Sequence, residues 1–376
     1  MKYLPLLLIC LIVPCLFAIS VSDVEDVRLR AESSRSELQA EDRGLIQEFW
    51  QKSLNQMLLS EKVEEIVEIR KQLEDQKGSE PLSFFASAYV SVANQDIQAA
   101  FENIARLEDT SKQQLFNQNL MILTAELKSP ALASIAISHI NDPDPVVRYW
   151  AVKALTNSGI IQALGSEVTA DEEVKTEILN TLKQHLETEQ QFEIYLMIIK
   201  FAAAMNHPVA HEILLTIADK RIDAYMNWSV EHEIVDAKLL IAIGNVAMMT
   251  SDAEVKSTFA RKFAEYYAFV FQRYFLGKDV LSDEQIDQVI SVILEVEEQV
   301  LPKMLNAPTG ILKAIQRNAA EREYENIFGD RLRSGELGTL YKFDYGKDDS
   351  GKAITEPPKL AEPPAPKSSE AETEAP

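Results

Sequence analysis

The chain has 376 residues, of which 46% are hydrophobic and 26% are charged, so it can bury a sizeable core. Its formal net charge of −22 repels phosphate backbones and anionic lipids, which argues against nucleic acid or an acidic membrane surface as a partner. Glycine is scarce, at 12 residues, and the internal prolines fall where helices would begin or end, so we expect an all-α fold.

Residues 1–22 have the pattern of a secretory signal peptide: Lys2, an apolar run, and then small residues. The run from Leu4 to Ile19 is shorter than the roughly 20 residues that a membrane-spanning helix needs. Ala18-Ile19-Ser20 fits the small-x-small cleavage rule, and Ser20-Val21-Ser22 is a second candidate. We therefore expect export to a periplasm or to the cell exterior, with no integral membrane span after cleavage. If the segment is retained, it would tether the protein to the membrane.

Four further regions are predicted along the chain. Residues 23–44 are a charged lead-in, either flexible or a frayed first helix. Residues 45–110 alternate between helix-like segments and short breaks, which is typical of TPR- or HEAT-like helical pairs, and residues 111–330 continue this pattern as repeats. Residues 331–376 become rich in glycine, proline and glutamate, so we expect a disordered tail, either a spacer of polyproline II character or a solvated end.

The segment 141–155 is the most informative part of the repeat region. Asp144 has the residue type and position of a helix N-cap, and Pro145 suits the first helical position, where its missing N–H has no cost. Apolar residues then recur at three- and four-residue spacing, which gathers them on one helix face. These residues are Val147, Trp150, Ala151, Ala154 and Leu155.

This segment resembles the second helix of a HEAT repeat. The match is clear over residues 141–164, and fainter copies lie near 169–182 and 250–263. The resemblance implies a right-handed α-solenoid of antiparallel helix pairs, HEAT- or TPR-like. It also implies a structural role in the repeat for Asp142, Asp144, Pro145, Arg148 and Trp150. Asp142 and Arg148 are expected to tie one repeat to the next.

Three pairs of residues have the spacing of a capping box, in which a hydroxyl and a carboxylate or amide satisfy each other's backbone donors. They are Thr169 with Glu172, Ser251 with Glu254, and Ser282 with Gln285. Each pair predicts the beginning of a helix.

No phosphate-binding loop, nucleophile elbow or cysteine pair is present, so we predict no catalytic residue and no cofactor. His207 and His211 are the weak candidates for a metal site, because residues four apart can share a helix face. Pro208 puts His207 at a helix entrance, so capping or exposure to water is the favoured interpretation.

Eight aromatic side chains lie between residues 259 and 275 and cover more than one helix face. The favoured interpretation is that this helix packs in the core. The alternative is that Tyr266, Tyr267 and Tyr274 form a ligand face for a sugar or a peptide.

The sequence therefore predicts an exported, non-enzymatic helical-repeat scaffold that binds a protein partner. The partner's identity and the oligomeric state are left open. The alternative function is a polysaccharide-binding or polysaccharide-processing accessory protein that uses the aromatic helix near 259–275.

Overall fold

The computed structural model describes residues 21–34, 37–78, 83–165, 171–317 and 319–363. The secondary structure of these residues is helical, and apart from two isolated β-bridges they form no strand pairing. The prediction of an all-α fold is confirmed. The chain divides into two compact units, residues 1–135 and 136–376, which are described one at a time.

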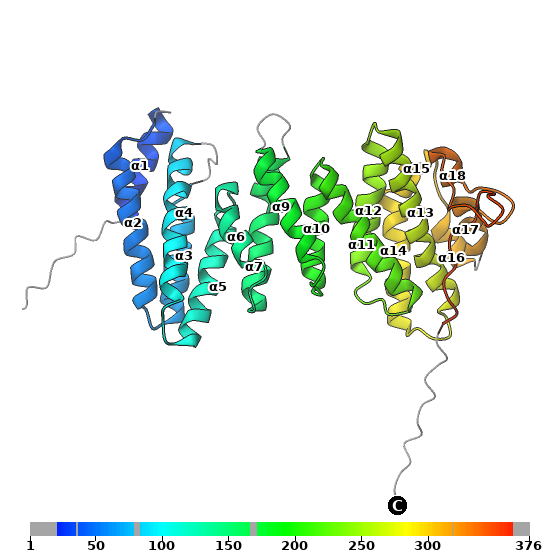
Figure 1. Cartoon of the computed structure of the whole chain (residues 1–376), viewed down its shortest axis with the longest axis horizontal. Helices are drawn as coiled ribbons and strands as arrows, with labels where there is room; N and C mark the ends of the chain where they lie inside the picture. Colours follow the sequence, from blue (N-terminus) through cyan, green and yellow to red (C-terminus); the bar gives the residue numbers. More distant parts are fainter. Residues whose placement is uncertain (1–20, 35–36, 79–82, 166–170, 318, 364–376) are drawn as a thin grey trace, which may run out of the picture. The chain divides into compact units, whose positions relative to one another are not determined.

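The first unit is built from helices that pack on their second neighbours as well as on their immediate ones. α2 contacts α4, α3 contacts α5, and α1 lies against both α2 and α4 (Figure 1, blue to cyan). The helices are α1 (Val21–Ser34), α2 (Ala40–Leu59), α3 (Val63–Asp75), α4 (Phe84–Ile104), α5 (Thr110–Glu126) and the 3₁₀ turn η1 (Pro130–Leu132). Val24 and Val27 of α1 are buried, so this part of the charged lead-in is an ordered helix rather than a flexible segment.

The second unit shows the same alternation. α10 packs on both α7 and α12, α12 packs on α14, and α11 packs on both α9 and α13 (Figure 1, green to yellow). Its helices are α7 (Pro145–Thr156), α8 (Ser158–Leu164), α9 (Glu172–His185), α10 (Phe192–Ala204), α11 (Pro208–Met226), α12 (Ile234–Met249), α13 (Ala253–Leu276), α14 (Asp283–Gln299), α15 (Leu301–Leu305), α16 (Ile311–Gln316), α17 (Ala320–Phe328) and α18 (Glu336–Tyr341). Helix α6 (Ala133–His139) spans the boundary between the two units.

Three helices of the second unit begin with the same local structure. Asp144 accepts a hydrogen bond from Val146 N over 2.8 Å at the start of α7. Asp171 and Asp252 each accept two backbone hydrogen bonds at the starts of α9 and α13. Each aspartate is followed three residues later by valine and then by a basic residue, so the shared sequence pattern has a shared structural meaning.

Of the three predicted capping boxes, one forms, one does not, and one lies outside the described residues. Ser282 and Gln285 form theirs at the start of α14, as the sequence predicts. The box predicted at Ser251 is wrong, because the adjacent Asp252 is the residue that caps α13. Thr169 lies outside the described residues.

The predicted disordered tail needs a correction for residues 331–363. This part contains helix α18, and its Leu337 and Leu360 are buried within the second unit. Composition alone suggested a solvated segment, but the side-chain amide of Gln272 on α13 bonds to the backbone of Pro358 and Leu360, and the carbonyl oxygen of Phe328 on α17 accepts from the hydroxyl of Tyr345. Residues 364–376 lie outside the described part of the chain.

Within the described ranges, no helix combines the length and the apolar character that crossing a bilayer requires. Residues 1–20 of the predicted signal segment are not among the described residues.

Candidate functional site

A polar hollow lies beside α7, where the HEAT-like segment is found. It has a volume of about 670 Å³. Its walls come from the loop before α7, the last turn of α9 and the loop that leads into α10. We call it the amide-lined hollow, and its lining residues are Asn141, Asp142, Pro143, Arg148, Gln184, His185, Thr188, Glu189, Gln190 and Gln191.

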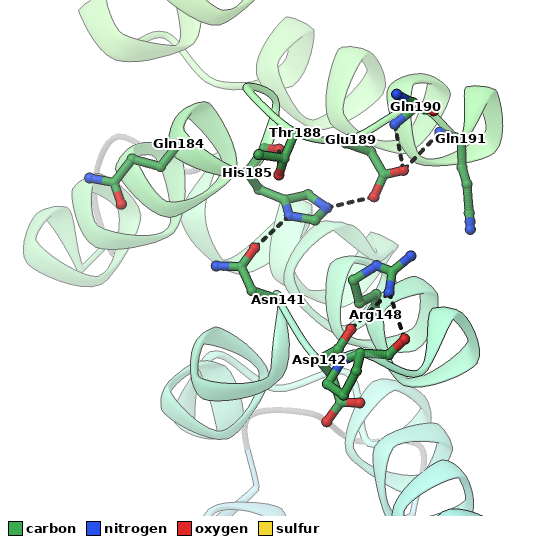
Figure 2. Close-up of a pocket in the computed structure, with 10 residues that line it drawn as sticks. Asn141, Asp142, Arg148, Gln184, His185, Thr188, Glu189, Gln190 and Gln191 are labelled. Carbon is green, nitrogen blue, oxygen red and sulfur yellow. Dashed lines mark hydrogen bonds and ion pairs between the residues drawn. The ribbon is translucent and has the colours of Figure 1, made fainter.

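His185 connects two of these walls. Its Nδ1 lies 3.0 Å from Oδ1 of Asn141 in the loop before α7, and its Nε2 lies 2.9 Å from Oε2 of Glu189 (Figure 2). The other carboxylate oxygen of Glu189 accepts hydrogen bonds from the backbone N–H groups of Gln190 and Gln191, both over 2.7 Å. The imidazole therefore fixes the distance between the loop of one helix and the beginning of another.

The environment of His185 favours the neutral imidazole. The residue is only 3% exposed. Burial lowers the pKa of His185 below its ordinary 6.5, the charge of Arg148 acts in the same direction, and Glu189 opposes both. The neutral ring carries one N–H, so it can donate to the oxygen of Asn141 or to that of Glu189 but not to both.

Arg148 and Asp142 stabilise the loop that forms one wall. Nη1 of Arg148 donates to the carbonyl oxygens of Asp142 and Pro143, over 2.8 and 3.1 Å. Oδ1 of Asp142 accepts from the backbone N–H of Asp144 over 2.8 Å. These bonds join α7 to the loop that precedes it, whereas Asn141 and His185 connect this loop to α9.

The other residues of the HEAT-like motif have ordinary structural places. Asp144 caps α7 and Pro145 is its first residue, as expected. Trp150 is only half-buried, and the ammonium of Lys153 lies 3.8 Å from the centre of its ring. Trp150 is therefore at the border of the apolar face rather than inside it.

The two candidate metal ligands do not form a cation site. His207 is the N-cap of α11: its Nδ1 accepts from Val209 N over 3.2 Å, and its Nε2 lies 3.3 Å from the Thr176 hydroxyl. The ring of His211 instead packs edge-on against Phe259, with 5.1 Å between centroids. Across the described ranges, no three His, Cys, Asp or Glu side chains come together as metal ligands would.

The tyrosines of α13 belong to the core. Tyr266 and Tyr267 are 0% exposed and Tyr274 is 7% exposed. Tyr266 donates to the carboxylate of Asp236, and Tyr267 donates to the carbonyl oxygen of Ile293 over 2.7 Å. The hypothesis that these three rings form a ligand face is therefore wrong, because a buried ring cannot stack on a sugar or a peptide.

The residues that shape the hollow were largely missed from the sequence. His185 and Glu189 are four residues apart, but a helix ends between them, so no helical spacing indicates their contact. The one local signal is the polar run Thr188-Glu189-Gln190-Gln191 between two apolar helices.

The amide-lined hollow presents the side-chain amides of Gln184, Gln190 and Gln191 beside the guanidinium of Arg148. Side-chain amides supply a donor and an acceptor together, which matches the N–H and C=O groups of an extended segment. No protein-family model matches this chain, and no curated protein matches it either. What the structure defines is an all-helical protein with a polar, amide-lined hollow on its second unit.

Proposed function

We propose that this protein is an exported, non-enzymatic α-solenoid of HEAT-like helix pairs that binds a protein partner. The observation that carries the proposal is the amide-lined hollow beside the HEAT-like helix, with its guanidinium and side-chain amides on a rigid frame. Rigid, pre-positioned polar groups lower the ordering cost of binding.

Helix packing supports the solenoid part of the proposal. α7, α10, α12 and α14 contact one another in succession, and α9, α11 and α13 do so in a second row. Except for α7 with α10, which are three helices apart, these contacts join helices two apart in the chain, as stacked antiparallel pairs would. A solenoid of this kind leaves one long face free for a partner.

Export is proposed from residues 1–22 alone. Intact-mass measurement of the protein recovered from the envelope or the medium tests it. A mature chain that begins at Val21 would support cleavage after Ser20, whereas retention of the apolar segment would favour a membrane-tethered form.

The partner is tested by affinity capture from the native envelope fraction, with the chain from Val21 onward as bait. We expect a saturable protein partner that Gln191→Ala or Arg148→Lys weakens. Gln299→Ala is the matched control, because Gln299 is exposed on α14 and does not line the hollow. Equal capture of the partner by all three variants would argue against the hollow as its binding site.

Glycan analysis of the same samples separates the two functional classes. Enriched glycan without protein would favour the polysaccharide alternative. The aromatic side chains of α13 that this alternative invoked are buried.

A further inference from the structure

We propose that α13, α17 and the loop after α11 form a recognition groove for extended, proline-containing segments, which the chain's own residues 356–361 occupy as an intramolecular ligand. We call residues 356–361 the strap. The groove residues that bond to it are Trp228 and Gln272, and Tyr324 bonds to the amide of Gln272. The proposal names a partner class and so rests on the proposed function, but it concerns a surface separate from the amide-lined hollow.

Gln272 binds the strap through its backbone. Its Nε2 donates to the carbonyl oxygen of Pro358 over 2.9 Å, and its Oε1 accepts from Leu360 N over 2.6 Å. Nε2 also donates to the hydroxyl of Tyr324 over 3.0 Å, which fixes the orientation of the amide. With the strap in place Gln272 is only 8% exposed, and two of the three hydrogen bonds of its amide are made with the strap backbone.

Trp228 makes the third backbone contact. Its indole Nε1 donates to the carbonyl oxygen of Ala361 over 3.0 Å. Trp228 itself has a φ of 55°, in the left-handed region that a bulky residue rarely adopts. The loop therefore holds this indole in an unfavourable backbone conformation at the position where it meets the strap.

The burial pattern of the strap is that of a polyproline II helix, which has three residues per turn. Pro357 and Leu360 are buried, whereas Pro358 and Lys359 between them are exposed. Adjacent prolines favour this conformation and carry no N–H, so few donors are left unsatisfied on binding. Aromatic-lined grooves with hydrogen bonds to backbone carbonyls are a recurrent way to bind such segments.

The groove is larger than the strap that occupies it. A hollow of about 320 Å³ remains between strap and helices, with Phe275 and the 45% exposed Leu276 in its wall. Glu321 and Glu325 of α17 line the same hollow, as does Lys359 of the strap. Lys359 forms its ion pair within the strap, with Glu356 over 3.5 Å, so the preferred occupant is a proline pair followed two residues later by an apolar residue, as in Pro357-Pro358-Lys359-Leu360.

Competition between the strap and a partner segment follows from the covalent connection. A segment joined by a short linker reaches effective concentrations on the order of millimolar, which weakens a competing peptide of micromolar affinity by about tenfold or more. The strap thus regulates access to the groove: a partner binds when its segment displaces residues 356–361.

The test uses the full chain and a fluorescent peptide with the sequence of residues 354–363. Leu360→Asp places a charge in the apolar contact and should release the strap. We expect this variant to bind the peptide at least tenfold more tightly than the wild type does, and Gln272→Ala in the same background to abolish binding. A peptide with alanine in place of Pro357 and Pro358 and aspartate in place of Leu360 is the matched control.

Release of the strap is monitored independently. The chain has 3 tryptophans, so its indole N–H signals are few, and that of Trp228 should shift in Leu360→Asp and return when the peptide is added. A released strap without peptide binding would overturn the proposal, since the strap would then be only a cover. Gln191→Ala in the amide-lined hollow should leave peptide binding unchanged, which separates this result from a failure of the proposed function.

If Leu360→Asp does not fold, the wild type gives the answer. A nitroxide-labelled peptide at millimolar concentration should exchange with the strap and broaden the Trp228 indole signal. An unchanged Trp228 signal would contradict the proposal.

Discussion

Arg221 holds the carboxylate of Asp236 with two parallel hydrogen bonds in the interior of the second unit. Nε donates to Oδ1 over 2.5 Å and Nη2 donates to Oδ2 over 2.9 Å. The hydroxyl of Tyr225 also donates to Oδ2, over 2.8 Å, and that of Tyr266 donates to Oδ1. Asp236 is 0% exposed, so this network joins α11, α12 and α13 without help from solvent.

Asp236→Asn should therefore destabilise the protein strongly. Removal of one charge leaves Arg221, whose side chain is 15% exposed, without a counter-ion, for which we expect a loss of about 3 kcal/mol in the free energy of unfolding. Tyr225→Phe, which removes one donor and keeps the pair, should cost about 1.5–3 kcal/mol. Urea unfolding followed by circular dichroism measures both, and equal midpoints for Asp236→Asn and the wild type would refute the prediction.

The aspartate caps give a second, smaller effect. Asp144→Ala should cost about 1 kcal/mol in the free energy of unfolding, because the backbone N–H of Val146 at the start of α7 loses its acceptor. Asp252→Ala should cost a similar amount, since its carboxylate does the same for α13. Asn at either position keeps an oxygen acceptor, so its loss in the free energy of unfolding should be well under half of the loss caused by Ala. If the Ala and Asn variants have the same urea midpoint, the caps do not stabilise these helices.

The sequence predicted what depends on local chemistry. Asp144 with Pro145, and Ser282 with Gln285, lie within a few residues of the helix that they begin, and both were predicted correctly. Ser251 was not, because two polar residues compete for one cap and Asp252, one residue nearer to the helix, provides the acceptor.

What depends on distant segments could not be predicted. Pro357 and Leu360 lie in a segment with the composition of a solvated tail, and only the surface of α13 and α17 makes their burial favourable. The contact of His185 with Asn141 joins residues 44 positions apart. The tyrosines of α13 were correctly favoured as core from their spacing, but their bonding to Asp236 and to Ile293 required the fold.

His185 makes stability depend on pH in a defined direction. Burial lowers its pKa in the folded state, so between that value and 6.5 the unfolded chain binds more protons than the folded one. Its contribution to stability is fully present above pH 6.5 and decreases as the pH falls toward the folded pKa, by at most about 1.4 kcal/mol per pH unit.

NMR titration of the histidine ring protons measures this pKa directly, and His185→Gln assigns the signal among the 5 histidines. His211, whose pKa is also lowered, chiefly by burial and then by His207, should titrate in the same direction. A His185 signal that titrates above 6.5 would mean that Glu189 outweighs burial, and the sign of the pH effect would reverse.

Two glycines provide a matched test of how the strap is positioned. Gly329 has a φ of 105°, and a Cβ there would overlap the carbonyl oxygen of Thr355, just before the strap begins. Gly351 has a φ of 79°, but a Cβ there would have no atom within 4 Å. Ala at position 351 carries a backbone cost of about 1–2 kcal/mol. Gly329, with a ψ of 170°, lies in a region that is essentially restricted to glycine, and Ala there must also move the chain at Thr355.

We therefore expect Gly329→Ala to shift the Trp228 indole N–H signal, because displacement of Thr355 carries the strap away from its bond with Ala361. Gly351→Ala should lower the urea midpoint and leave that signal in place. A Trp228 signal that is unchanged in Gly329→Ala would show that the strap is held by Gln272 and Leu360 alone, without the close approach at Thr355.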